Sequence, residues 1–225
     1  MNKAREFAER AREAALRAGS KELAALSRSD VAANEADVGN LDRAREQIAE
    51  ALALAPTQAV QVWAGTVLGR SGERRQAIAI ADELERKYPA NTLNKNLWVP
   101  TIRAAVALDT NNPGAALAVL RLATPYEFGL DTGLYPNYLR GMAYLKQRAG
   151  PSAAAEFQKI LDHPGIVRNS LIGALAHLQL ARAYALQGDS AKARTKYQDF
   201  LTLWKDADPD IPILKEAKAE YAKLK

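Results

Sequence analysis

The sequence predicts an all-α protein built from helical hairpins stacked in a row. Apolar residues recur at three- and four-residue spacing along most of the chain, and no segment alternates as a β-strand would. Turn sequences such as Gly188-Asp189 separate the predicted helices. A small residue in one helix, followed twelve residues later by an alanine, occurs five times. Together these observations favour packing of helix on helix.

The first half of the chain divides into five helices and a connection. We expect an N-terminal helix over 2–18, with Phe7, Ala11, Ala14, Ala15 and Ala18 near one apolar stripe, followed by a helix that Ser20 caps and that ends near Val38. Further helices are expected over 42–54, 57–70 and 73–88, with Pro56 and Pro89 as helix ends. Residues 90–99 are expected to form a connection that contains a short apolar piece.

The second half continues in the same way. We expect a helix from Pro100 to Asp109, then helices over 115–123, 137–147, 151–161 and 173–204, the last interrupted by the Gly188 turn. Residues 125–136 and 162–169 are expected to be loops. Asp210 precedes Ile211-Pro212, which predicts that Asp210 caps a final helix over 211–224.

Five hairpins share a register set by one small residue in the first helix of each. These anchors are Ala32, Gly65, Ala104, Gly141 and Ala181. The alanines twelve residues later are Ala44, Ala77, Ala116, Ala153 and Ala193. Small residues let the two helices of a hairpin approach closely, and neighbouring hairpins must stack because one hairpin cannot bury its apolar face alone. An irregular helical bundle is the alternative, and the five alanines in register argue against it.

The pattern resembles the tetratricopeptide repeat (TPR). Besides the anchors and alanines, Tyr144 and Tyr184 match the family's aromatic position, and Pro56 and Pro89 match its terminal proline. The family period is about 34 residues, and the wider spacing of several anchors makes these repeats degenerate. The resemblance implies an α-solenoid of about five degenerate TPR-like hairpins in a single domain over 1–225. Its repeats would span about 25–56, 58–89, 97–124, 134–164 and 174–205, between an N-terminal helix and a capping helix over 211–224.

Longer stretches extend the resemblance. WVPTIRAA, AAAEFQKILDH and IGALAHLQLARAYALQGD are similar to the C-terminal region of large bacterial proteins that carry a eukaryotic-like serine/threonine kinase, or a winged-helix DNA-binding domain, ahead of a TPR array. This implies a non-catalytic, partner-recruiting or sensing region of a signalling protein. Because the chain begins directly with helix, we expect it to be a piece of a longer protein. A membrane span in that parent would then decide whether the region is cytoplasmic or extracytoplasmic.

In an array of this family the first helices line the concave side, where a protein or peptide partner binds. Aromatic rings beside cations suit an extended peptide with an acidic group, although aromatics at helical spacing also serve as core residues. Counting from the anchors gives the following inward-facing candidates: Asp37, Arg70, Trp98, Asp109, Tyr135, Tyr138, Met142, Lys146 and Arg182.

Composition excludes several other functions. The chain has 225 residues with a net charge of +5, and the positive charge is scattered, so no nucleic-acid footprint is expected. There is no cysteine, His163 and His177 lack a second ligand at metal spacing, and neither kinase nor nucleotide-binding motifs occur, so we expect no metal, no cofactor and no enzyme activity. No apolar run approaches the roughly 20 residues of a membrane span. Self-association in a structural array, and nucleic-acid binding by the helices, remain alternatives to partner recruitment.

Overall fold

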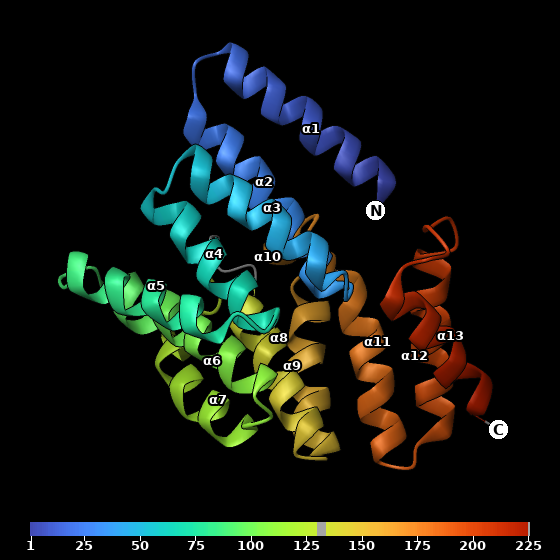
Figure 1. The fold of residues 1–225 in the computed structure, drawn as a ribbon. Coiled ribbons are helices and arrows are strands. Elements are labelled where there is room, and N and C mark those ends of the chain that lie inside the picture. Colours follow the sequence, from blue (N-terminus) through green and yellow to red (C-terminus); the bar gives the residue numbers. More distant parts are fainter. Residues whose placement is uncertain (130–133, 225) are drawn as a thin grey trace. The chain divides into compact units, whose positions relative to one another are not determined.

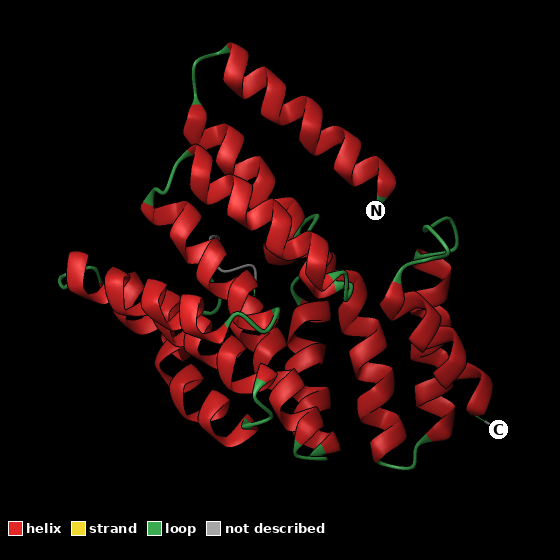
Figure 2. Cartoon of the chain, in the orientation of Figure 1, coloured by secondary structure: helices red, strands yellow, loops and turns green. Residues whose placement is uncertain are grey.

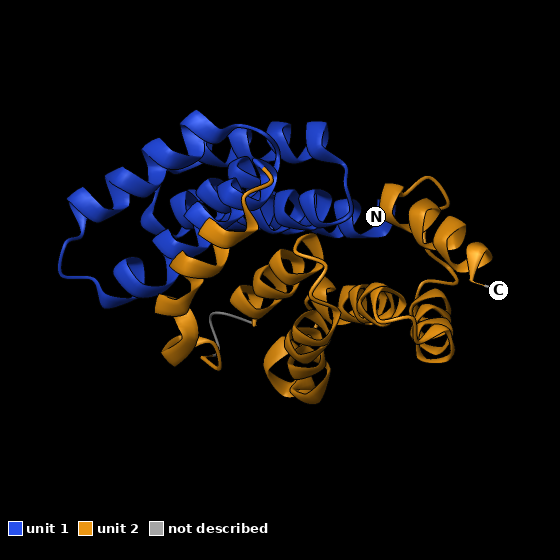
Figure 3. Cartoon of the chain, turned by 90° about the horizontal axis from the view of Figure 1, so that it is seen from below, with its two compact units in different colours: residues 1–110 blue, residues 111–225 orange. Residues whose placement is uncertain are grey.

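The computed structural model describes residues 1–129 and 134–224, and every regular element in these ranges is helical (Figures 1 and 2). The all-α prediction is confirmed. The chain divides into two compact units, Met1–Thr110 and Asn111–Lys225 (Figure 3). The boundary falls inside the repeat predicted over 97–124.

The first unit contains six α-helices and one π-helical segment. Helix α2 packs against α3 and α4 packs against α5, while α1 packs on α2 and α6 packs on α4 and α5 (Figure 1). Ser20 caps α2 as predicted, because its hydroxyl accepts a hydrogen bond from the Leu23 amide. The elements are α1 (Asn2–Arg17), α2 (Lys21–Asp37), α3 (Leu41–Leu54), α4 (Gln58–Arg70), α5 (Arg74–Lys87), η1 (Asn94–Trp98) and α6 (Val99–Asp109).

The second unit is built in the same manner. Helix α8 packs on α9, α11 packs on α12 and on α9, and α13 closes the unit by packing on α12. Asn112 and Asp189 cap α7 and α12 through side-chain oxygens that accept amide hydrogen bonds. The elements are α7 (Pro113–Leu120), η2 (Arg121–Tyr126), α8 (Tyr135–Lys146), α9 (Gly150–Asp162), α10 (Pro164–Val167), α11 (Leu171–Leu186), α12 (Ser190–Leu203) and α13 (Pro212–Lys223).

The repeat register predicts burial of the small anchors and of the alanines twelve residues later. All five anchors and all five alanines twelve residues later are buried. So are the residues sixteen and nineteen positions after each anchor, from Ile48 and Ala51 to Tyr197 and Phe200. The anchors must also be small: a β-carbon added to Gly65 would lie 2.6 Å from Ile102 Cδ1. The register therefore marks the positions through which helices pack within each unit.

The five residues that lie seven positions after the anchors all have the same left-handed backbone conformation. Their φ is positive in all five cases: 90° at Gly39, 86° at Gly72, 55° at Asn111, 59° at Arg148 and 77° at Gly188. In four of these turns the next amide bonds to the carbonyl five residues before it, as in Asn40 to Glu35 and Ala149 to Tyr144. This is the hydrogen bond of the Schellman motif, which ends a helix with one left-handed residue.

Replacing Arg148 by glycine is expected to stabilise the protein by about 1 kcal/mol, because an L-residue with a side chain costs about that much in the left-handed region. The opposite exchange, Gly188→Arg, places a side chain in the equivalent turn and is expected to destabilise by a similar amount. Thermal unfolding followed by circular dichroism measures both. A loss of stability in Arg148→Gly would mean that contacts of the arginine outweigh its backbone strain.

The connection expected over 90–99 is in fact mostly helical. The Asn91 side chain accepts a hydrogen bond from the Asn94 amide, and η1 then runs directly into α6. Pro100 lies in the first turn of α6, as predicted, but that helix continues directly from η1. The Val99 amide bonds to the Asn94 carbonyl five residues back, so the helix is widened just before a proline that cannot donate.

The two predicted loops are shorter than expected. Pro125 and Tyr126 belong to η2, Tyr135 and Pro136 open α8, and residues 130–133 lie outside the described part of the chain. The second loop, over 162–169, contains the short helix α10. Both segments were expected to be loops because they are rich in proline and glycine. Proline is tolerated in the first turn of a helix, so helices begin in both segments with a proline in that turn.

Two local predictions were wrong. The N-cap of α13 is Ile211, without a side-chain hydrogen bond, so Asp210 does not cap this helix. On α1, the stripe through Phe7, Ala11, Ala14 and Ala18 is exposed, and Ala15 alone of the predicted stripe is buried. The helix instead turns the side that carries Arg5, Ala8, Arg12 and Ala15 toward α2, because Arg5 pairs with the buried Glu35 of that helix.

Candidate functional site

Four of the predicted partner-binding residues, Asp37, Arg70, Trp98 and Asp109, lie in the first unit, at the ends of helical segments. Arg70 ends α4 and forms an ion pair with Asp37 of α2, whose side chain is only 5% exposed. Trp98 ends η1 and is half-buried, whereas Asp109 ends α6 and is exposed. Arg70 therefore joins two helices of its own unit, and Asp109 presents its carboxylate to solvent.

Four of the predicted residues lie on α8. Tyr135 and Met142 are half-buried, and Lys146, the last residue of the helix, is exposed, with Nζ 3.4 Å from Asn111 Oδ1. Tyr138 is fully buried; its ring meets the Phe157 ring at a centroid distance of 6.0 Å. The prediction that Tyr138 contacts a partner is therefore wrong for this structure, because the aromatic side chain belongs to the core.

Arg182 holds the last helix of the second unit. Its Nε and Nη2 donate to the two carboxylate oxygens of Glu220 at 2.9 and 2.8 Å, and Nη2 also lies 3.1 Å from Glu216 Oε2. The Tyr197 hydroxyl donates to the same Glu220 carboxylate at 2.8 Å. Burial, and then this carboxylate, raise the pKa of Tyr197 above its ordinary value. Arg182 thus fastens α13 to α11, a role that sequence spacing could not reveal.

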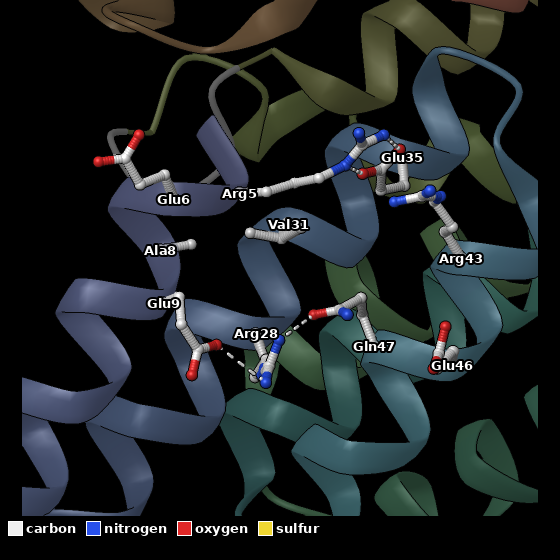
Figure 4. A pocket seen from close by; sticks show the side chains of 10 residues that line it. All are labelled: Arg5, Glu6, Ala8, Glu9, Arg28, Val31, Glu35, Arg43, Glu46 and Gln47. Atoms are coloured by element: carbon white, nitrogen blue, oxygen red, sulfur yellow. Dashed lines mark hydrogen bonds and ion pairs between the residues drawn. The ribbon is translucent and has the colours of Figure 1, made fainter. Parts of the chain in front are cut away.

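A cleft of about 320 Å³ opens between α1, α2 and α3 (Figure 4). Ala8 and Val31 lie in its middle. At one end Arg5 forms an ion pair with Glu35, and the Glu35 carboxylate also accepts a hydrogen bond from Asn40 at 2.7 Å. The other end and the rim carry the remaining lining residues: Glu6, Glu9, Arg28, Arg43, Glu46 and Gln47.

Most charges of this cleft are already neutralised. Arg28 lies 3.0 Å from Glu9 Oε2 and 2.7 Å from Gln47 Oε1. The hydrogen bond from Arg12, opposed by burial and aided by the charge of Arg28, lowers the pKa of Glu9. Glu9 is therefore ionised at neutral pH and is not suited to act as a general acid. Arg43 and Glu46 at the rim make no ion pair with another described residue.

The lining of the cleft does not have the composition of a typical small-molecule pocket. Small-molecule pockets are mostly apolar with a few polar groups, whereas this lining is mostly arginine and glutamate. Within residues 1–129 and 134–224, no group of three or more histidine, aspartate or glutamate side chains is arranged to hold a metal ion. His177 belongs to the second unit, on α11, and burial, aided by Lys196, lowers its pKa, so its ring is neutral at pH 7.

Sequence reasoning missed this cleft because it placed α1 by its apolar stripe. The pairing of Arg5 with Glu35 turns that stripe away from α2 and opens the space between α1 and α3. The sequence did contain an indication of how α1 is oriented. Charged residues recur at helical spacing on the side of α1 that faces α2. Charges at a helical interface are expected only where they find partners.

Comparison with known proteins adds no family: no family model matches the chain, and no curated protein matches it. None of the helices in the described ranges combines the length and the apolar character needed to cross a membrane.

Proposed function

We propose that this chain is a non-catalytic interaction module, a TPR-like array of helical hairpins that recruits or senses a protein partner for a larger signalling protein. The observation that carries the proposal is the repeated hairpin: five turn residues with positive φ, each seven residues after a buried small anchor. Identical packing positions repeated along a chain leave the positions between them available for binding.

The exposed and half-buried members of the predicted set support a peptide partner. Asp109 and Lys146 end first helices with opposite charges, and Tyr135 and Met142 offer adaptable apolar surface on α8. An extended segment carrying an acidic group and an apolar side chain fits the α8 residues. Arg70 and Arg182 contribute indirectly, because their ion pairs keep helices of their units in place.

A selection of displayed peptides against the purified chain tests the proposal. We expect the selected peptides to bind Lys146→Glu about tenfold more weakly than wild type, which corresponds to roughly 1.4 kcal/mol. Fluorescence anisotropy measures the affinities. Lys218→Glu, which reverses an exposed lysine on α13, is the matched control and is expected to bind as wild type does.

Two results would count against the proposal. If no peptide is selected, partner recruitment by these surfaces has no support. If single-stranded RNA or duplex DNA binds instead, with an affinity that falls steeply as salt rises, the helices form a nucleic-acid surface. Charge reversal at Arg182 is unsuitable as a test, because it would place a carboxylate against Glu216 and Glu220 and release α13.

A further inference from the structure

Helix α1 has the sequence of a second helix in a hairpin. Residues 10–13 read Arg-Ala-Arg-Glu, and the same four residues recur at 43–46 in α3. The separation equals that between the first two anchors, Ala32 and Gly65. In this register Ala11 corresponds to Ala44, and Ala18 corresponds to Ala51.

The two helices differ in what covers them. Ala44 and Ala51 are fully buried in the core of the first unit, which includes Ala25, Ala32 and Ala36 of α2. Ala11 and Ala18 are exposed on α1. The same side of α1 carries Ala14, which is exposed, and Phe7, which is 60% exposed. The face that α2 covers on α3 is therefore uncovered on α1.

We propose that the α1 face formed by Phe7, Ala11, Ala14 and Ala18 binds a helix of a partner protein that has the chemistry of α2. Such a helix carries small residues at four-, three- and four-residue spacing, as Ala25, Ser29, Ala32 and Ala36 do. This inference rests on the proposed recruiting function and names the partner class for one surface of it. The proposal rests on the packing of this chain itself, because α2 covers the same sequence motif on α3.

The occupant is a helix because the face is spaced for one. Its residues follow one another at four, three and four positions, which matches the spacing by which side chains of one helix fit between those of another. Alanines permit close approach of the two backbones, and Phe7 supplies one large apolar contact. A helix bound there would remove the exposed aromatic ring from water.

Two features point to a partner protein. The turn before α3 is Gly39-Asn40, but the corresponding residues in α1, Glu6 and Phe7, lie inside the helix, so no tight turn joins another helix at that place. Lys3, Arg10 and Arg17 follow the face at seven-residue spacing and are exposed. Two antiparallel copies of α1 would bring these cations together, whereas an α2-like helix with acidic residues would complement them.

A peptide with the sequence of residues 20–38 is the probe. We expect it to bind the full chain, and to bind Ala11→Glu at least about tenfold more weakly, since the substitution puts a charge into an apolar contact. Ala191→Glu, an exposed alanine replaced on α12, is the control for the protein. The same peptide with Ala32→Glu is the control for the probe.

A second experiment removes the cost of folding the free peptide, because isolated helices of this length are marginal in water. Residues 20–38 are joined ahead of Met1 through a flexible linker of about ten residues, which raises the effective concentration to the order of millimolar. We expect a higher unfolding temperature than for the same fusion carrying Ala11→Glu. Neither Ala11→Glu nor Ala18→Glu should change the unfolding of the unfused chain, because both positions are exposed.

Three results would overturn the inference. The first is a fusion that melts at the same temperature with and without Ala11→Glu. The second is a peptide that binds wild type and Ala11→Glu equally. The third is sedimentation showing a wild-type dimer that Ala11→Glu dissociates, which would make a second copy the occupant. None of these results alters the effect expected of Lys146→Glu on selected peptides, so the two proposals fail separately.

Discussion

Arg140→Met is expected to destabilise the second unit by about 3–5 kcal/mol, the range found when one partner of a buried ion pair is removed. The Arg140 side chain is 8% exposed and forms ion pairs with Glu127 and Glu156, whose side chains are 4% and 11% exposed. Asn137 Nδ2 donates to Glu156 at 3.0 Å, and Lys159 lies 3.1 Å from the same carboxylate. Without the guanidinium, two buried carboxylates would lose the cation that they share.

Urea denaturation and hydrogen exchange of the α8 and α9 amides measure this loss. Lys192→Met is the matched control in the same unit, because the Lys192 side chain is 65% exposed in its pair with Asp189 and surface pairs contribute little. Adding Glu127→Gln to Arg140→Met should recover part of the stability, because Lys159 would then serve one buried carboxylate, Glu156, instead of two. Equal, small effects of Arg140→Met and Lys192→Met would show that the buried network contributes nothing beyond packing.

Gly141→Ala is expected to destabilise the second unit by about 1–3 kcal/mol, the usual cost of overpacking a core. A β-carbon on Gly141 would lie 2.5 Å from two ring carbons of Phe157 and 2.9 Å from a third. The Phe157 ring is fully buried and packs edge-on to Tyr138, so it has no space into which to move. The gain in helix propensity from glycine to alanine, about 1 kcal/mol at most, is too small to offset the clash.

Gly114→Ala supplies the matched control. Gly114 lies in the first turn of α7 in the same unit, is exposed, and its added β-carbon would meet nothing closer than Asn112 Oδ1 at 3.9 Å. This variant should unfold at the same or a slightly higher temperature than wild type. Replacing Phe157 by leucine in the Gly141→Ala background should restore part of the lost stability. If Gly141→Ala is as stable as Gly114→Ala, the close approach of α8 and α9 is not required.

The helices and their turns were largely predictable because their signals are local. Ser20 caps a helix where the sequence predicts a cap, and Gly39, Gly72 and Gly188 mark turns that need positive φ. Asn111 and Arg148 occupy equivalent turns without glycine, and the repeat register points to both of them. The register predicts burial correctly because a hairpin that packs on itself and on a neighbour must bury the same positions each time.

The candidate site was less predictable because charge pairing is not local. Arg70 and Arg182 stand at positions that suggest partner contacts, yet their guanidinium groups bond to carboxylates of their own unit that lie more than thirty residues away in the chain. Tyr138 stands beside Tyr135 on the same helix, and only its neighbours Phe157 and Gln179 make it a core residue. The spacing of residues along a helix shows which face a side chain occupies, but it does not show which neighbour packs against that face.

The amino-acid sequence by itself determined that this protein is all helix, where most helices begin and end, and which small residues lie at helix contacts. These properties follow from backbone hydrogen bonding, side-chain periodicity and turn chemistry over a few residues. Only the tertiary structure decided which face of α1 is covered and which arginines are engaged. That outcome depends on distant partners such as Glu35 and Glu220, and a buried carboxylate such as that of Glu35 must find a cation wherever the chain brings one.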